Sequence, residues 1–204
     1  MAEQIIKITV PKGKRAIYDS DAQTIRFIPI KNYTNIRNFK DVCEALNVNY
    51  EEVMAELNSN ALLSMADKAK VMLRMVLQAV NRDHKFSMIE GTVYYPCINM
   101  VRDSDYASFK RNNSSYFRDN LWEEIGSFVY EGNTYYLVGG SAYFGAGAGL
   151  ASFYSRLGVG VSDAHFGFMR CKSSEVAKHV SKYFGTIVWD AMYADDLGFT
   201  LTKD

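Results

Sequence analysis

Residues 165–192, which read HFGFMRCKSSEVAKHVSKYFGTIVWDAM, say most about how this chain folds. Up to Cys171 the residues alternate between the two faces of an extended chain, which predicts a half-buried strand. Ser173 follows with a hydroxyl that can cap the first turn of a helix. Gly185 can end that helix early. The apolar residues at helical spacing that predict this helix are Val176, Ala177, Val180, Phe184, Ile187, Val188 and Ala191.

The first part of the chain predicts a β-hairpin followed by three helices. β-rich runs at residues 15–18 and 24–30 flank a turn, and a further run at residues 4–10 precedes them. The third and longest helix is expected over residues 65–81. Its main apolar stripe comprises Met65, Ala69, Met72, Leu73, Val76 and Val80. The residues expected to cap the three helices are Asn38, Asn49 and Ser64.

From residue 84 onwards the composition shifts to aromatic residues, glycine and short β-like runs, with a hairpin turn at residues 131–133. A soft boundary at residues 84–91 divides a hairpin-plus-helix part, 1–86, from a β-rich part with the last helix, 87–204, unless the two form one domain. The predicted fold class is α+β. It consists of an N-terminal β-hairpin and three helices, then a mainly antiparallel sheet with a long C-terminal helix packed on it.

Composition narrows the function classes. The 204 residues contain 23 Lys and Arg and 23 Asp and Glu, so the net charge is zero. A nucleic-acid partner is therefore not favoured, whereas a subunit of an assembly is compatible with neutrality. No apolar run approaches the roughly 20 residues that span a membrane, and no signal peptide is evident. Three dispersed cysteines predict buried free thiols in a protein made in a reducing cytoplasm.

The sequence of the glycine-rich stretch at residues 139–149 does not match that of a nucleotide-binding loop. A phosphate loop needs Lys followed by Ser or Thr after its glycines, and that pair is missing. The glycines instead predict a flexible loop or the close approach of another backbone.

No catalytic, metal or cofactor site is predicted. The three histidines share no metal-ligand spacing with each other or with the cysteines. His165 and Cys171 could be imagined as a catalytic pair, but nothing in the sequence marks the thiol as activated. Three acidic residues near the C-terminus are interpreted as a solvated turn; they are Asp190, Asp195 and Asp196.

Residues 102–120 interleave aromatic residues with arginine and small polar residues, as recognition surfaces do. A long loop that packs its own aromatic side chains explains the pattern equally well. The candidate binding residues, with two from the glycine-rich stretch, are Tyr106, Phe109, Arg111, Tyr116, Phe117, Arg118, Tyr143 and Phe144.

The order of these pieces resembles a group of proteins encoded by phages and prophages of gut Bacteroidales, including crAss-like phages. This chain departs from their usual Arg-Leu-Cys-Phe-Lys-Ser junction before the last helix, because residues 169–173 read Met-Arg-Cys-Lys-Ser, and it matches thinly over residues 98–160. The residues that carry the resemblance are Ile17-Tyr18-Asp19, Ile25-Arg26-Phe27, residues 39–46, Tyr94-Tyr95-Pro96, residues 170–177 and Tyr183-Phe184.

The resemblance implies a virion-associated or accessory protein made in the host cytoplasm and located in the virion. The leading hypothesis is a non-enzymatic capsid, tail or fibre component that contacts other virion proteins as a homo- or hetero-oligomer, through residues 102–120 and 139–156. The alternative is a carbohydrate- or receptor-binding module on the virion surface, with Tyr106, Tyr116 and Tyr143 stacking on a surface glycan. No membrane partner is expected. A third hypothesis is an enzyme that uses Cys171 or His165.

Overall fold

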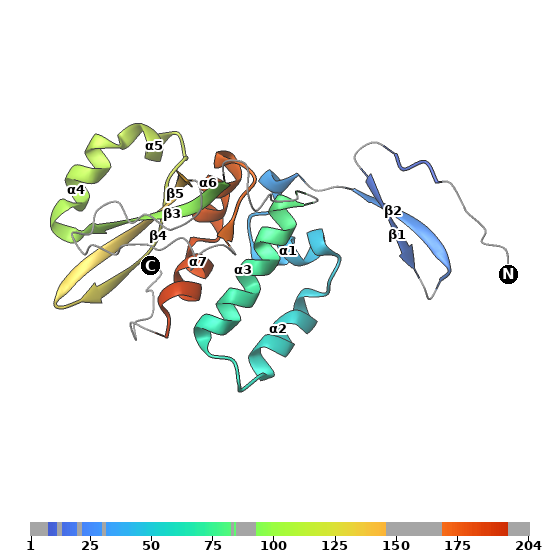
Figure 1. Cartoon of the computed structure of the whole chain (residues 1–204). Coiled ribbons are helices and arrows are strands. Elements are labelled where there is room, and N and C mark those ends of the chain that lie inside the picture. The colour runs from blue at the N-terminus through green and yellow to red at the C-terminus, as the bar shows by residue number, and fades with distance from the viewer. Residues whose placement is uncertain are drawn as a thin grey trace. The chain divides into compact units, whose positions relative to one another are not determined.

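The computed structural model describes residues 8–11, 14–19, 22–29, 32–82, 84, 93–145 and 169–195. The chain divides into two compact units, residues 1–32 and 33–204. This division falls earlier than the composition change at residues 84–91. Figure 1 shows the elements of each unit.

The first unit contains the predicted hairpin. Strands β1 (Lys14–Asp19) and β2 (Thr24–Pro29) pair antiparallel, from Lys14 opposite Pro29 to Asp19 opposite Thr24. The Asp19 carboxylate accepts a hydrogen bond of 3.0 Å from the backbone N–H of Ala22, which stabilises the turn. Most of the run predicted at residues 4–10 lies outside the described residues.

The second unit begins with a short 3-10 helix (Tyr33–Asn35) and the three predicted helices, α1 (Phe39–Leu46), α2 (Tyr50–Ser59) and α3 (Met65–Asn81). Each predicted cap is confirmed, because the side chains of Asn38, Asn49 and Ser64 accept hydrogen bonds from amides of the first turn. Met65 does not belong to the buried stripe of α3, since it is 57% exposed at the start of the helix.

The sheet has the strand order β3-β5-β4 and is antiparallel, with β3 at Val93–Arg102, β4 at Glu123–Tyr130 and β5 at Asn133–Gly145. The predicted turn between β4 and β5 is confirmed. Glu131 and Gly132 have φ values of 48° and 73°, as the two central residues of a type I′ turn require.

The predicted C-terminal helix is two helices, α6 (Ser174–Tyr183) and α7 (Gly185–Tyr193), which meet at Phe184. Ser173 caps α6 as expected, by accepting a hydrogen bond of 3.3 Å from the amide of Val176. Gly185 packs directly on Ile125, where any side chain would overlap that residue. The strand predicted before this unit lies mainly outside the described residues, and Cys171 forms an isolated antiparallel bridge with Tyr94.

One hydrophobic core joins the helices before the sheet to the elements after it. It contains buried residues of α1, α3, β3, β4, β5, α6 and α7, among them Val42, Leu73, Ile98, Leu137, Val180 and Val188. Val101 and Val138, which alternate with core residues along β3 and β5, belong to a second cluster with Phe109. Because neighbouring strand residues point to opposite faces, the second cluster lies on the other side of the sheet.

The start of α6 is tied to the end of α3. The side chain of Asn81 donates to the carbonyl of Arg170 at 2.7 Å and accepts from the backbone N–H of Lys172 at 2.9 Å. The ammonium group of Lys172 donates to the carbonyl of Asn81 at 3.1 Å. Asn81 is buried, so these bonds satisfy polar groups that would otherwise be costly to remove from water.

Helix α6 approaches β5 closely at two glycines. The hydroxyl of Ser181 donates to the carbonyl of Cys97 in β3 and accepts from the amide of Gly140 at 3.0 Å. A Cβ atom on Gly139 would overlap the carbonyl of Ser181, and one on Gly140 would overlap the carbonyl of Leu121. These two glycines therefore let other backbone segments come close, which is one of the two options that the sequence left open for residues 139–149; residues 146–149 lie outside the described residues.

We expect Gly139→Ala to lower the free energy of unfolding by roughly 2–3 kcal/mol, because α6 must move away from β5 to admit the methyl group. Gly132→Asn is the matched control: no atom lies within 4 Å of the added Cβ, and Asn tolerates the positive φ of this turn. Urea denaturation of the three proteins measures both changes. Equal stability of Gly139→Ala and the natural protein would contradict the close packing.

Candidate interaction surface

Residues 102–120, expected as a loop, form two helices instead, α4 (Asp103–Asn112) and α5 (Ser114–Arg118). The sequence contained a signal for α4 that the loop interpretation overlooked. Asp103 and Asp105 lie in its first turn and Lys110 and Arg111 in its last, which suits the helix dipole at both ends. Helix α4 packs on β3 and β5 (Figure 1).

An aromatic cluster fills the space between these helices and the sheet. Phe109 is buried beside Val101 and Val138. Its ring stacks on Trp122, with centroids 5.5 Å apart and an interplanar angle of 11°, and Phe117 lies edge-on to both rings. The loop hypothesis was therefore wrong about the backbone, although the expected packing of aromatic residues on one another occurs.

Tyr106 is held from several sides. Its ring stacks on Tyr136 of β5 at a centroid distance of 4.1 Å, and its hydroxyl donates to the Glu124 carboxylate. The ammonium group of Lys110 lies 4.7 Å from the ring centroid and 3.7 Å from Glu124. Burial, together with the hydrogen bond to Glu124, raises the pKa of Tyr106 well above its ordinary value. Tyr106 is thus a neutral donor at physiological pH.

The outer side of the cluster reaches solvent at three residues, Tyr116, Arg118 and Leu121, which we call the α5 edge. Tyr116 is 44% exposed while its ring stacks on Trp122 at 4.6 Å, and Leu121 is 54% exposed. Arg118 is exposed and lies 3.2 Å from the Asp119 carboxylate. The edge therefore combines an oriented aromatic ring, an exposed aliphatic residue and a guanidinium group.

A lysine side chain from α6 holds the α5 edge in position. The ammonium group of Lys182, a buried lysine, donates to the backbone carbonyl and, at 2.9 Å, to the side-chain oxygen of Asn120. Asn120 has a φ of 55°, a left-handed conformation that asparagine tolerates better than most residues. The link joins the turn after α5 to the helix that packs on the opposite face of the sheet.

The structure brings four of the eight predicted binding residues into one cluster: Tyr106, Phe109, Tyr116 and Phe117. Arg111 and Arg118 are exposed on the same two helices. Tyr143 and Phe144 pair with β3 at the opposite end of β5, and their side chains lie outside what the structure describes. Sequence reasoning missed Leu121 and Trp122, although an aliphatic residue and a tryptophan next to an aromatic segment were an available signal.

The thiols are poorly suited to nucleophilic chemistry. Cys43, Cys97 and Cys171 are free and buried, as predicted. Burial raises the pKa of Cys97 and of Cys171 to about 12, so both remain protonated at neutral pH. His165, the imagined partner of Cys171, lies outside the described residues. Among those residues, no group of three His, Cys, Asp or Glu side chains is placed to hold a metal ion.

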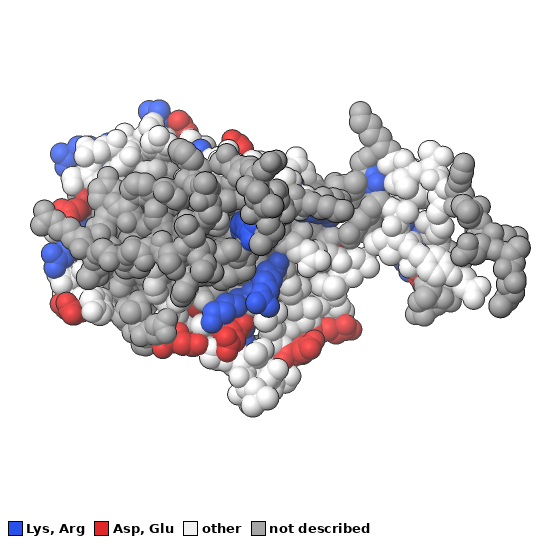
Figure 2. Space-filling view, viewed as in Figure 1, with Lys and Arg blue, Asp and Glu red and all other residues white. Residues whose placement is uncertain are grey.

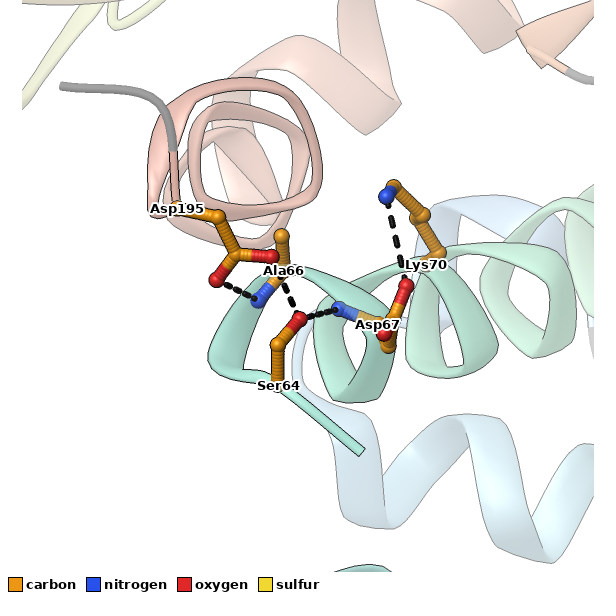
Figure 3. Close-up of polar contacts among 5 residues, drawn as sticks. All are labelled: Ser64, Ala66, Asp67, Lys70 and Asp195. Carbon is orange, nitrogen blue, oxygen red and sulfur yellow. Dashed lines mark hydrogen bonds and ion pairs between the residues drawn. The ribbon is translucent and has the colours of Figure 1, made fainter. Parts of the chain in front are cut away.

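Asp195 lies in an exposed turn after α7, as predicted, whereas Asp190 lies within α7 and is half-buried, which corrects the interpretation for that residue. Figure 3 shows the carboxylate of Asp195 at the start of α3, where it accepts from the hydroxyl of Ser64 and, at 3.3 Å, from the amide of Ala66. It thereby adds negative charge at the positive end of that helix, beside the Asp67–Lys70 ion pair. Burial raises the pKa of Asp190, and Asp196 lies outside the described residues.

No protein-family model, curated protein or solved structure matches this chain. In the described part of the chain, no helix is both long and apolar enough to cross a membrane.

His179 gives the fold a testable pH dependence. Its Nε2 lies 2.7 Å from the Ile36 carbonyl, and its ring packs against Tyr33 and Tyr183. Burial lowers the pKa of His179, a shift reinforced by the positive charges of Arg37 and Lys182 and opposed by the Ile36 carbonyl. Below the ordinary histidine pKa of about 6.5 the unfolded chain therefore binds a proton more readily than the folded one.

We expect the free energy of unfolding to fall as the pH drops below about 6.5 and on through the lowered pKa of His179. His179→Gln should reduce this slope, because the variant has no imidazole to protonate at that position. Asn58→Gln, at an exposed position of α2 and without a titratable group, should leave the slope unchanged. Urea denaturation between about pH 7 and pH 5 measures all three. An unchanged slope in His179→Gln would contradict the assignment.

Proposed function

We propose that this protein is a non-enzymatic structural component of a bacteriophage particle and that it contacts other virion proteins through the α5 edge. The observation that carries the contact role is the exposed Tyr116 ring stacked on Trp122, beside the exposed Leu121. The phage assignment is supported by the sequence resemblance at both ends of the chain.

The geometry of the α5 edge suits protein recognition. Tyrosine, tryptophan and arginine are the residues most enriched at the energetic centres of interfaces. Stacking on Trp122 already restricts the Tyr116 ring, so binding costs little further side-chain entropy. Arg118 and Arg111 add cations at the rim, where charges guide the approach of a partner.

The electrostatics also favour an assembled subunit. The chain has equal numbers of basic and acidic residues. On the face shown in Figure 2, both blue and red side chains occur on the described surface. Such a surface neither attracts a phosphate backbone strongly nor repels copies of itself.

A glycan-binding module on the virion surface is the second candidate, supported by the exposed Tyr116 ring. A sugar needs a free aromatic face, and Tyr106, named for that role from the sequence, already stacks on Tyr136 and donates to Glu124. Tyr116 is the remaining candidate among the described residues of that set. A surface polysaccharide that binds there would change the fluorescence of Trp122, which lies against the ring.

The first experiment is quantitative mass spectrometry of purified phage particles beside the infected-cell lysate. We expect the protein at a stoichiometric copy number in the particle. Tyr116→Ser/Leu121→Ser should reduce its incorporation about tenfold or more, as loss of an interface centre does. The matched control is Val129→Ser, which removes an exposed apolar side chain near the β4–β5 turn.

Absence of the protein from the particle would contradict the structural role. Normal incorporation of Tyr116→Ser/Leu121→Ser would contradict the α5 edge as the contact surface. A polysaccharide-dependent change in Trp122 fluorescence that Tyr116→Ser abolishes would favour the glycan-binding module.

A further inference from the structure

The connection between α2 and α3, residues 60–65, exposes two apolar side chains, and we call it the α2–α3 tip. Leu62 is 93% exposed and Met65 is 57% exposed. In Figure 1 the connection lies at the lower end of the second unit, and the atoms at that place in Figure 2 are white, the colour of residues other than Lys, Arg, Asp and Glu. Large apolar side chains exposed next to one another are typical of interaction sites.

Hydrogen bonds hold the backbone of the tip at both ends. The side-chain oxygen of Asn60 accepts from the amide of Leu62 at 3.0 Å, which forms an Asx turn at the end of α2. At the start of α3 the hydroxyl of Ser64 accepts from the amide of Asp67 at 3.1 Å and donates to the Asp195 carboxylate (Figure 3). The apolar side chains are thus presented by an ordered turn, which lowers the entropy cost of binding a partner.

Carboxylates accompany the apolar side chains of the tip. Residues 49–67 contain four acidic residues and no basic residue. Asp67 is paired with Lys70, whereas Glu52 and Glu56 lie one helical turn apart on α2 and are both exposed. An anionic membrane surface or a phosphate backbone would repel this part of the protein. The tip therefore fits a partner surface that combines apolar groups with cations.

The α5 edge has that composition. Residues 106–122 contain three basic residues and one acidic residue, Asp119. Arg111 and Arg118 are exposed, and the ion pair of Arg118 with Asp119 is of the exposed kind that contributes little and exchanges partners readily. The exposed Tyr116 ring and Leu121 offer contacts to aliphatic side chains and to the thioether of a methionine.

We propose that the α2–α3 tip of one copy docks on the α5 edge of a second copy, so that copies of this chain join head to tail. The apolar side chains of the tip pack on the Tyr116 ring, and the carboxylates of α2 face the two arginines. Helix α2 packs on α1, whereas α4 packs on β3 and β5, so tip and edge lie on different parts of the second unit (Figure 1). Each copy therefore keeps a tip or an edge for a further copy, and the contact builds rings or open chains.

This inference names a partner for the α5 edge and so rests on the contact role proposed above. The partner belongs to the same chain, which means that the purified protein alone is sufficient to test it. The structural role in the phage particle is tested separately, by the incorporation of the protein into the particle.

Sedimentation velocity of the full chain measures the contact, with loading concentrations from about 1 to about 100 μM. The natural protein should form species larger than a dimer as its concentration rises. Leu62→Ser/Met65→Ser and Tyr116→Ser/Leu121→Ser should each remain monomeric. Val129→Ser, which removes an exposed apolar side chain elsewhere, should associate like the natural protein. All these positions are exposed, so urea denaturation should show unchanged unfolding midpoints.

Mixing the two double variants distinguishes a head-to-tail contact from a symmetric one. The tip variant retains an intact edge and the edge variant retains an intact tip, so an equimolar mixture should form a dimer with one copy of each and no larger species. A contact between two like surfaces would leave the mixture without this dimer.

Charge variants test the electrostatic part of the contact. Glu52→Lys/Glu56→Lys should weaken the association about tenfold or more, and adding Arg111→Glu/Arg118→Glu to the same chain should recover part of the loss. The matched control is an equal change in net charge at exposed positions of α1 and of the β4–β5 turn, which should leave the association intact; it is Glu44→Lys/Glu131→Lys.

A monomer at every concentration, or a mixture of the two double variants that stays monomeric, would overturn the proposal. If the natural protein is monomeric but Tyr116→Ser/Leu121→Ser is still lost from the phage particle, the head-to-tail contact is wrong and the contact role of the α5 edge stands. Head-to-tail association of a protein that is absent from the particle would support this contact and contradict the structural role.

Discussion

The structure depends on the close approach of α6 to β5. Ser181 satisfies the Cys97 carbonyl and the Gly140 amide with one hydroxyl, and Gly139 leaves room for the backbone of α6. Without this fit the helix could not bury its apolar side, because each added side-chain atom at the contact would separate the two elements. These hydrogen bonds leave no polar group unsatisfied at the contact, since the Ser181 hydroxyl, the Cys97 carbonyl and the Gly140 amide are all paired.

The contact of α6 with β5 also positions the α5 edge, which lies on the other side of the sheet. Lys182, the residue after Ser181, reaches the turn at Asn120 and holds it in a left-handed conformation. Leu121 and Trp122 follow that turn directly, and the stack of Tyr116 on Trp122 orients the exposed ring. The candidate interaction surface is therefore positioned by a helix on the opposite face, through a buried ammonium group.

The features that were predicted from the sequence are those set by neighbouring residues, namely the helix caps and the turn between β4 and β5. Asn38, Asn49, Ser64 and Ser173 cap helices as their side chains suggest, and Glu131-Gly132 forms the turn that its φ values require. Gly185 was named as a residue that can end the helix early, but its contact with Ile125, sixty residues earlier, could not be predicted from the local sequence. Asp195 as a cap for α3 was not predictable either, since it needs residues 131 positions apart.

Composition identified most residues of the candidate site, but the predicted backbone structure, a loop, was wrong. Tyr106 and Phe109 were named correctly as members of one aromatic group, but their spacing of three is a helical one and was taken for a loop. Which rings face solvent depends on packing against Val138 and Tyr136 from a distant strand, and nothing local distinguishes Phe109 from Tyr116. The exposure of a side chain depends on tertiary packing, so it cannot be predicted from the neighbouring residues in the sequence.

Native-state hydrogen exchange of the Gly140 amide tests the central claim most directly. If α6 and β5 form one cooperative contact through Ser181, this amide should exchange only in the opening that also exposes the amides of α6. Its opening free energy should then equal that of Val180, and both should fall together as urea is added. Fast exchange at Gly140 while α6 stays protected would show that the helix is held by other contacts, and the account would be wrong.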